Sequence, residues 1–212
     1  MEGFFTIEDN TSAEITEKKS KFIANLFYIE NKSEAEDNIK EIRKKYHDAR
    51  HNCIAYRVME NDSIIEKSSD DGEPSGTAGA PMLEILKNQD LCNVLVIVTR
   101  YFGGILLGTG GLARAYTEAV MSAIKKCKKT YKCEGYLAEI KIEYKALEIF
   151  KYYCKNNDIN IIEMDYTNVV NCKIELENNR KEKLLYDIDN KNINVIEIKN
   201  LCKKLISKSV EK

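Results

Sequence analysis

Residues 93–116, NVLVIVTRYFGGILLGTGGLARAY, hold the strongest fold signal of the chain. Their first part is an almost unbroken apolar run, which predicts a central strand over residues 93–100 that is covered on both faces. A glycine-rich turn follows. A helix is then predicted from Leu112 to about Lys126, because its apolar residues recur at helical spacing and its basic end suits a helix C-terminus. A strand, a turn and a helix are thus expected around one core.

Upstream of this stretch, the alternation of apolar residues predicts further strands and one helix. A first strand is expected over residues 21–29. A helix is expected to start at Ser33, where Ser33 and Glu36 match a capping box. A strand over residues 53–59 should pair with residues 63–66 as a hairpin. The apolar face of the helix would consist of Ala35, Ile39, Ile42 and Tyr46.

Residues 68–81, SSDDGEPSGTAGAP, include both prolines of the chain and are rich in glycine. Such a composition is typical of a long ordered loop. The residues after it, up to Asn88, predict a short helix that begins near Ala78. The loop and the glycine-rich turn therefore lie on either side of the central strand in the sequence.

The chain beyond Tyr131 is rich in Lys, Asn, Glu and Ile and predicts a second domain. The expected order, βαββαβ, is that of a ferredoxin-like fold. We expect domains at residues 1–130 and 134–212, joined near residues 130–134, in a chain of the α+β class. The predicted elements are strands at 136–144, 159–166, 169–176 and 195–198 and helices at 146–155 and 180–188.

Composition and charge exclude several classes of protein. The 212 residues are 43% hydrophobic and 32% charged with a net charge of −1. No global field therefore favours nucleic acid or an anionic membrane. The first residues lack the pattern of a secretory signal, and no apolar run is long enough to span a bilayer. The seven cysteines are scattered and predict reduced thiols. We expect a cytoplasmic protein with no membrane partner.

The glycine-rich turn is the first candidate site. Gly108, Gly110 and Ala113 match the dinucleotide fingerprint G-x-G-x-x-A, but they lie too far from the strand and lack the acidic residue that should follow. No Walker A lysine follows either. Glycines at a helix N-terminus can still bind an anion through backbone N–H groups, here flanked by Arg100 and Arg114. The alternative, that the glycines only allow close packing and tight turns, stays open.

The acidic loop is the second candidate, since Asp70, Asp71 and Glu73 could hold a hard cation together with nearby hydroxyl groups. The spacing is not that of an EF-hand. General acid–base catalysis by two of these carboxylates is the other chemical interpretation. For any single residue here, a solvated turn that caps its own backbone is favoured.

Two further groups have a functional and a structural interpretation. His51 and Cys53 point to the same face of a predicted strand, as a nucleophilic pair would, but a packed core thiol is favoured. The aromatic residues of the second domain could stack on bases, yet their spacing favours the core. These aromatic residues are Tyr144, Phe150, Tyr152, Tyr153 and Tyr166.

Four blocks of sequence resemble the signature blocks of the YigZ/Impact family: EKKSKFIA (17–24), ARHNCIAYR (49–57), SSDDGEPSGTAGAPML (68–83) and VTRYFGGILLGTGGLARAY (98–116). They occur in order, and the resemblance covers about residues 1–130. It implies an N-terminal α/β domain similar to a small-subunit ribosomal protein and to the GHMP kinases. It also implies a C-terminal ferredoxin-like domain similar to one in elongation factor G. Eukaryotic Impact regulates translation by competing for a protein partner of a stress kinase, and no established enzymatic activity comes with the family.

The sequence therefore predicts a binding or regulatory protein linked to translation, with RNA or a ribosome-associated protein as partner. One alternative is an enzyme acting on a nucleotide or phosphorylated small molecule with Mg²⁺, and another is a protein–protein adaptor. No cofactor is expected apart from that Mg²⁺, no catalytic residue is assigned, and the oligomeric state stays open. The candidate binding residues are Arg50, His51, Ser69, Asp70, Asp71, Glu73, Ser75, Thr77, Arg100, Tyr101, Gly103, Gly104, Gly108, Gly110, Gly111 and Arg114.

Overall fold

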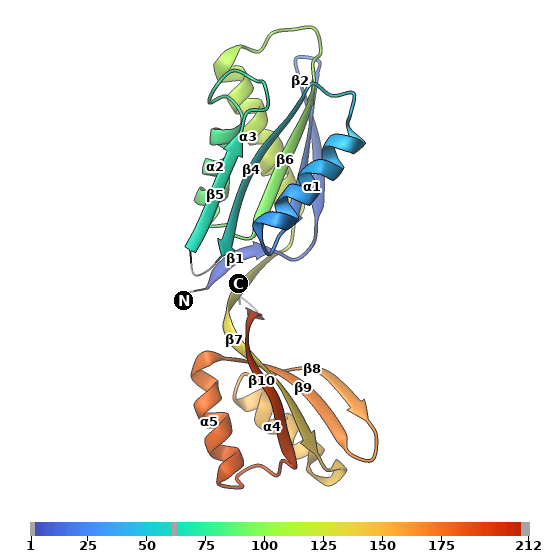
Figure 1. Ribbon diagram of the computed structural model, residues 1–212, viewed down its shortest axis with the longest axis vertical. Helices are drawn as coiled ribbons and strands as arrows, with labels where there is room; N and C mark the ends of the chain where they lie inside the picture. Colours follow the sequence, from blue (N-terminus) through green and yellow to red (C-terminus); the bar gives the residue numbers. More distant parts are fainter. Residues whose placement is uncertain (1–2, 61–62, 209–212) are drawn as a thin grey trace. The chain divides into compact units, whose positions relative to one another are not determined.

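The computed structural model describes residues 3–60 and 63–208. The chain is an α+β protein that divides into two compact units, one formed by Phe4–Tyr131 and the other by the chain from Lys132 on (Figure 1). Each unit is built on an antiparallel sheet. No helix in the described part of the chain is long and apolar enough to cross a membrane.

The sheet of the first unit has the order β2-β3-β6-β4-β5, with every neighbouring pair antiparallel. The central strand β6 is buried along its length except at Tyr101. Val94, Val96 and Val98 face one core, whereas Leu95 and Ile97 face the other. The apolar run is continuous because both faces of the strand are covered, and the predicted central strand is confirmed. The strands are β2 (Thr11–Glu17), β3 (Ser20–Tyr28), β4 (His51–Glu60), β5 (Ser63–Ser69) and β6 (Val94–Tyr101).

Helices cover both faces of this sheet (Figure 1). Helix α1 (Lys32–Lys45) packs on one face, and α2 (Gly79–Asn88) and α3 (Gly108–Lys126) pack on the other. The predicted buried positions of α1 are confirmed at Ala35, Ile39 and Ile42.

Two helix starts differ from their predictions. The N-cap of α1 is Asn31, whose side chain accepts the Glu34 N–H at 2.9 Å, so the predicted cap at Ser33 is wrong. Asparagine caps a helix as well as serine does, so the sequence alone does not decide between the two positions. Helix α3 starts at Gly108 rather than Leu112, so the glycines form its first turn, although glycine is a poor helix former.

No prediction covers the first two strands of the chain. Strand β1 (Phe4–Ile7) pairs with β7 (Lys129–Ile142), and Phe5 packs edge-on against Tyr131 with ring centroids 5.1 Å apart. Strand β2 has exposed residues on one face and polar ones at most positions, which hides its period. Both strands are recognisable only from the partners they pair with.

The second unit has the element order β7-α4-β8-β9-α5-β10 and the strand order β10-β7-β9-β8. Its helices are α4 (Leu147–Asn156) and α5 (Asn178–Asp189), with a short 3₁₀ turn at Tyr144–Ala146 before α4. The predicted junction at residues 130–134 lies inside β7, so the chain passes from one unit to the next as a continuous strand. The remaining strands are β8 (Asn160–Tyr166), β9 (Val170–Glu177) and β10 (Glu197–Lys208).

The aromatic residues of the second unit divide into two groups. Phe150 is buried, as predicted, and Tyr153 is partly buried against the same core. Tyr144, Tyr152 and Tyr166 are 51%, 68% and 54% exposed, so the prediction that they lie in the core is wrong. Helical spacing brought Tyr152 near the core stripe, but the α4 helix buries only Leu147, Phe150 and Cys154.

Candidate functional site

Asp70 holds the start of α2. Its carboxylate accepts backbone N–H groups from Gly76 at 2.8 Å, Ala78 at 2.9 Å and Gly79 at 2.8 Å. Burial by itself would raise the pKa of Asp70, but the three N–H donors outweigh it and lower the pKa from its usual value. The aspartate is therefore a helix-capping group whose oxygens are already engaged.

Asp71 ties the acidic loop to the beginning of β4 and to α1. One carboxylate oxygen accepts the Asn52 N–H at 2.7 Å, and the other accepts from the Arg43 guanidinium at 2.7 Å. Its carbonyl oxygen lies 2.9 Å from His51 Nδ1. A carbonyl only accepts, so Nδ1 carries the proton and His51 is a hydrogen-bond donor to the loop.

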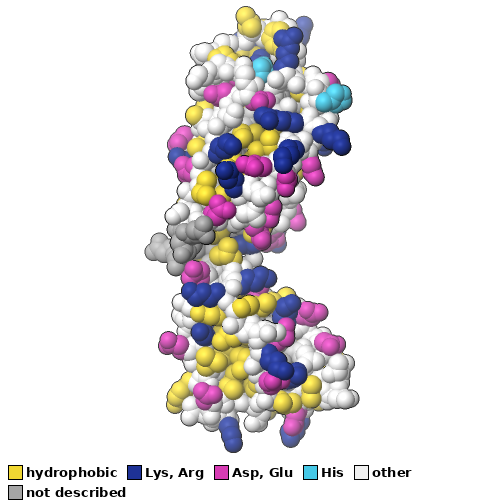
Figure 2. All heavy atoms as spheres, viewed as in Figure 1, with side chains coloured by type: hydrophobic (Ala, Val, Ile, Leu, Met, Phe, Trp, Pro, Cys, Tyr) yellow, Lys and Arg dark blue, Asp and Glu magenta, His cyan; other side chains and the backbone are white. Residues whose placement is uncertain are grey.

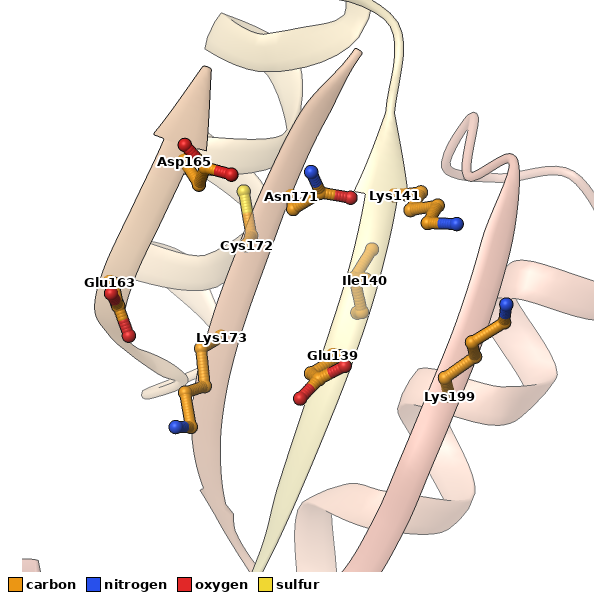
Figure 3. Close-up of a pocket in the computed structure, with 9 residues that line it drawn as sticks. All are labelled: Glu139, Ile140, Lys141, Glu163, Asp165, Asn171, Cys172, Lys173 and Lys199. Atoms are coloured by element: carbon orange, nitrogen blue, oxygen red, sulfur yellow. The ribbon is translucent and has the colours of Figure 1, made fainter. Parts of the chain in front are cut away.

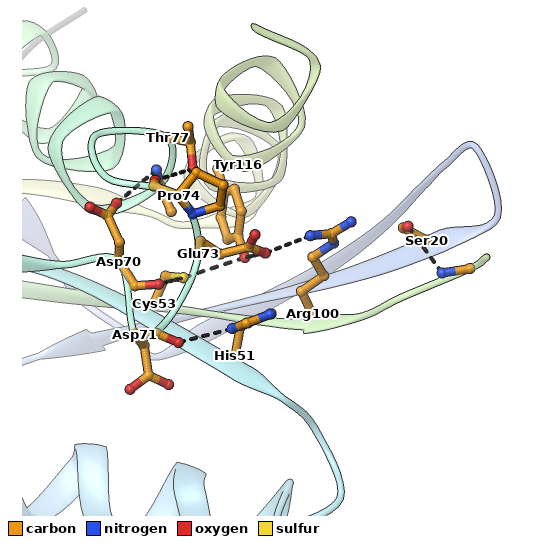
Figure 4. A network of polar contacts seen from close by, with 12 residues as sticks. Ser20, His51, Cys53, Asp70, Asp71, Glu73, Pro74, Thr77, Arg100 and Tyr116 are labelled. Carbon is orange, nitrogen blue, oxygen red and sulfur yellow. Dashed lines mark hydrogen bonds and ion pairs between the residues drawn. The ribbon is translucent and has the colours of Figure 1, made fainter. Parts of the chain in front are cut away.

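Glu73 and Arg100 form a buried ion pair (Figure 4). Their side chains are 3% and 7% exposed, and Arg100 Nη1 lies 2.7 Å from Glu73 Oε1. The same oxygen accepts the Tyr116 hydroxyl at 2.8 Å. The loop therefore places the Glu73 carboxylate in the protein interior, where Arg100 of β6 and Tyr116 of α3 bind it.

Cys53 completes this network from β4. Its thiol lies 2.9 Å from the Asp70 carbonyl oxygen and 3.3 Å from Tyr116 Oη. Burial, together with the nearby carboxylates, raises the pKa of Cys53 to about 12, and burial also raises the pKa of Tyr116. Cys53 is accordingly a protonated core thiol at neutral pH. The nucleophilic interpretation of His51 and Cys53 has no support, because catalysis needs the thiolate.

The Arg100 guanidinium lies near two aromatic rings, 5.5 Å from the Phe22 centroid and 5.6 Å from the Phe102 centroid. Such ring faces attract a cation. Its Nε is buried and has no hydrogen-bond partner among the described residues. The cation is therefore stabilised by one carboxylate and by ring faces, in a setting where the loss of Glu73 would leave it unpaired.

The other candidate residues of the acidic loop are structural or exposed. Ser69 Oγ accepts the Asp71 N–H at 3.3 Å, and the Thr77 hydroxyl donates to the Pro74 carbonyl at 2.7 Å. Ser75 is exposed. The favoured interpretation, a turn whose polar side chains satisfy its own backbone, describes Ser69 and Thr77 well.

The glycine-rich turn is packed on the β2–β3 hairpin. Gly103 donates its N–H to Ser20 Oγ at 3.1 Å, and a Cβ on Gly103 would lie 2.0 Å from the Lys19 carbonyl carbon. Close packing is thus the reason for glycine at this position. Gly104 has a φ of 85°. That value lies in the left-handed region, which favours glycine. Tyr101 precedes the turn, and its hydroxyl donates to Asp48 at 2.7 Å, which raises the pKa of Tyr101 to about 12.

The N-terminus of α3 is open. It has no side-chain cap and no acidic residue in its first turn, and a Cβ on Gly108 or Gly110 would meet no atom within 4 Å. Gly111 is nearer its surroundings, with Leu107 Cβ at 3.1 Å. Backbone N–H groups are available here to an outside acceptor.

The charged candidates do not gather into one open site. Glu73 and Arg100 pair with each other, and Asp71 pairs with Arg43. Arg114 and Arg50 are not buried, and neither side chain has an ion-pair partner in the described part of the chain. Among the described residues no group of three or more His, Cys, Asp or Glu is placed to hold a metal ion.

Sequence reasoning overlooked three members of the network. Arg43 lies on α1 and carries no local signal of its distant partner. Phe22 and Tyr116 fall within a predicted strand and a predicted helix, and neither was predicted to belong to a site. A buried tyrosine hydroxyl requires a partner, so Tyr116 on the apolar face of a helix was a usable signal.

A hollow of about 210 Å³ lies on the sheet of the second unit, on the face opposite the helices (Figure 3). Lysines and carboxylates alternate across it: Lys173 faces Glu139 and Glu163 on the neighbouring strands. Such mixed charge is poorly suited to a polyanion. Its lining is Glu139, Ile140, Lys141, Glu163, Asp165, Asn171, Cys172, Lys173 and Lys199.

These features define an α+β protein with two antiparallel sheets, whose acidic loop is closed by its own hydrogen bonds. The Impact N-terminal domain family matches residues 18–124, which include the whole polar network. The chain belongs to the IMPACT family.

Relatives agree with this assignment. The chain is similar to IMPACT family member YvyE of Bacillus subtilis, with 48% identity over 58% of this chain and 57% of that protein. It is also similar to IMPACT family member YigZ of Escherichia coli, with 36% identity over 75% and 78% of the two chains. A crystal structure described as that of a hypothetical protein aligns over 100% of both chains with a TM-score of 0.62 and 30% identity.

Proposed function

We propose that this protein is a non-catalytic binding or regulatory protein linked to translation, acting through RNA or a ribosome-associated partner. The link to translation rests on the family, because its eukaryotic member Impact regulates translation. The observation that favours a binding role over a catalytic one is the closed acidic loop. The carboxylates of Asp70, Asp71 and Glu73 are each already bound by groups within the protein.

We also propose a finer fold assignment for each of the two units. The strand order β10-β7-β9-β8 supports a ferredoxin-like second unit, because the first and third strands of its βαββαβ order lie in the centre of the sheet. The sequence resemblance supports a first unit similar to a small-subunit ribosomal protein and to the GHMP kinases. Both likenesses favour a partner in the translation apparatus.

The test is co-sedimentation of the purified chain with ribosomes over a range of salt concentrations. Contacts to phosphate make binding weaken as salt rises. We expect Arg50→Ala combined with Arg114→Ala to reduce binding and its salt slope, because neither side chain is buried or has an ion-pair partner among the described residues. Lys203→Ala combined with Lys204→Ala, at exposed positions of the second unit, is the matched control. A chain that stays in the supernatant at every salt concentration contradicts the proposal.

The enzymatic alternative keeps one supporting observation, the open N-terminus of α3, which could accept a phosphate group. It would require Mg²⁺ to displace the partners of Asp70, Asp71 or Glu73. A rise in melting temperature with ATP and Mg²⁺, abolished by Asp71→Ala, would favour the enzyme. The adaptor alternative differs in its partner: the chain would still bind ribosomes in the presence of excess competing RNA.

A further inference from the structure

Three apolar side chains are exposed on the turn between β6 and α3. Phe102 is 50% exposed, Ile105 is 42% exposed and Leu106 is 83% exposed. Leu106 has the highest exposed fraction of any large hydrophobic side chain in the described residues. We call these three residues the apolar tip. Neighbouring apolar side chains that are exposed together mark an interaction site, whereas exposed apolar residues scattered singly need no explanation.

The backbone under the apolar tip is fixed by close packing. Gly103 lies against the β2–β3 hairpin so tightly that any side chain would collide with Lys19, and its N–H is bound to Ser20 Oγ at 3.1 Å. The Phe102 ring lies against the Arg100 guanidinium. At the other end, Leu107 is buried in the core. A turn anchored at both ends presents its side chains with little conformational entropy left to lose on binding.

The surroundings of the apolar tip are positively charged. Lys18 and Lys19 form the exposed turn of the hairpin that packs on Gly103, with φ values of 44° and 63°. Neither lysine has an ion-pair partner among the described residues. Arg114 lies on α3, where side chains lean toward the helix N-terminus. The uncapped first turn of α3 adds the positive end of its dipole. Glu17, the last residue of β2, is a carboxylate next to Lys18 in the sequence.

The combination of apolar and basic groups is visible at this end of the first unit. Figure 1 shows the β6–α3 turn above the β2–β3 hairpin at the top of the view, and Figure 2 shows hydrophobic next to Lys and Arg side chains there. Helix α3 runs from this end of the unit to Lys126, over 19 residues. The helix separates the two points by roughly 28 Å, at about 1.5 Å per residue.

From these observations we infer that the apolar tip docks into an apolar groove with an acidic rim on a protein partner. The inference rests on the proposed function and names the chemistry of its partner. Charge complementarity selects the rim, because Lys18, Lys19 and Arg114 have no competing ion-pair partners among the described residues. An apolar groove is inferred because the Leu106 side chain is the most exposed of the three and would be buried there.

Other anionic occupants fit less well. Bases of single-stranded RNA stack on aromatic rings. Of the three tip residues only Phe102 has a ring, which lies against the Arg100 guanidinium, whereas Ile105 and the most exposed residue, Leu106, have none. Recognition of anionic lipid uses clusters of about four to eight lysines and arginines, more than the apolar tip has around it. A protein groove uses both the aliphatic side chains and the modest positive charge.

The experiment places a photo-crosslinking phenylalanine analogue at position 106 of the full chain and irradiates it with purified ribosomes and with the post-ribosomal supernatant. We expect one protein adduct, with the crosslinked peptide in a segment that combines apolar and acidic residues. The analogue at position 149, an exposed isoleucine of the second unit, is the control. An adduct to RNA or lipid, an adduct shared with position 149, or no adduct overturns the inference.

Affinity for the crosslinked protein, purified, then tests the chemistry. We expect Leu106→Asp to weaken binding about tenfold or more, as loss of an interface anchor does, and Lys18→Glu with Lys19→Glu to weaken it and remove its salt dependence. Ile149→Asp and Lys203→Glu with Lys204→Glu are matched exposed controls. Wild-type affinity in Leu106→Asp overturns the inference.

The same variants separate this inference from the proposed function. If wild-type chain and Leu106→Asp co-sediment equally with ribosomes, the proposed function holds and the apolar tip is not the docking element. If the chain does not sediment with ribosomes but the crosslinked protein binds through Leu106, the docking surface stands and the ribosomal link fails. Unchanged unfolding curves show that the variants are folded, as expected when an exposed side chain is replaced.

Discussion

The acidic loop, residues 68–81, and the glycine-rich turn, residues 102–111, behave in opposite ways. The loop is rich in charged and polar residues, yet Glu73 is buried and Asp70 caps a helix. The turn is rich in apolar residues, yet Leu106 is exposed to water. The polar residues of the acidic loop therefore stabilise the fold, while the apolar residues of the glycine-rich turn lie on a surface that is available for binding.

The largest effect is expected from removing the buried charge of the loop. Glu73→Ala leaves Arg100 buried without its carboxylate. We expect a loss of about 3–5 kcal/mol in the free energy of unfolding, measured by urea denaturation. Ser75→Ala, exposed in the same loop, should change stability little.

A double variant tests the cause of that loss. Because replacing both charges by apolar groups removes the unpaired cation, Glu73→Leu with Arg100→Met should recover much of the stability. A loss below about 1 kcal/mol in Glu73→Ala contradicts a structural role for the pair.

Within the glycine-rich turn, two glycines should respond oppositely to the same change. Gly103→Ala forces a Cβ against the Lys19 backbone. We expect a loss of about 1–3 kcal/mol from this overpacking. Gly110→Ala would meet no neighbouring atom in the first turn of α3. It should stabilise the protein by about 0.5–1 kcal/mol, since alanine favours a helix over glycine. Thermal unfolding compares the two, and equal effects would show that the turn is not anchored at Gly103.

The smallest of the three losses of stability is expected at the cap of α2. Asp70 accepts three backbone N–H groups. Asp70→Asn should cost about 1 kcal/mol at neutral pH, because an amide replaces the carboxylate in the cap. The pKa of Asp70 is lower in the folded protein than in the unfolded chain. Its stabilisation is thus complete above the unfolded pKa, about 3.9, and is lost as pH falls through the folded pKa.

Denaturation of wild type and Asp70→Asn between neutral pH and strong acid checks the sign. The two stabilities should differ at neutral pH and converge in acid, where both side chains are uncharged. A difference that stays constant over this range would show that the cap does not depend on the charge of Asp70.

Local patterns predicted most elements because their cause is local. Residues 93–100 predicted a strand from apolar character, and α1, α2 and most elements of the second unit followed from period and turn residues. Strand β10 is the exception, since it was predicted at residues 195–198 and extends over Glu197–Lys208. The predictions failed where two local choices were equal, as at Ser33 and Asn31, or where a strand depends on its partner, as at β1 and β2. They also failed at Tyr152, because a helix face beside the core stripe has the same spacing as the stripe.

The resemblance of four sequence blocks identified the family, and apolar character and composition predicted the central strand and the two segments beside it. They left each candidate site with two open interpretations. The folded chain was needed to show that Glu73 and Arg100 pair in the core, because the partners of a charge come from distant elements. The same holds for the apolar tip. Leu106 and Leu107 are adjacent leucines, and packing against the rest of the unit decides that Leu107 is buried and Leu106 is exposed to water.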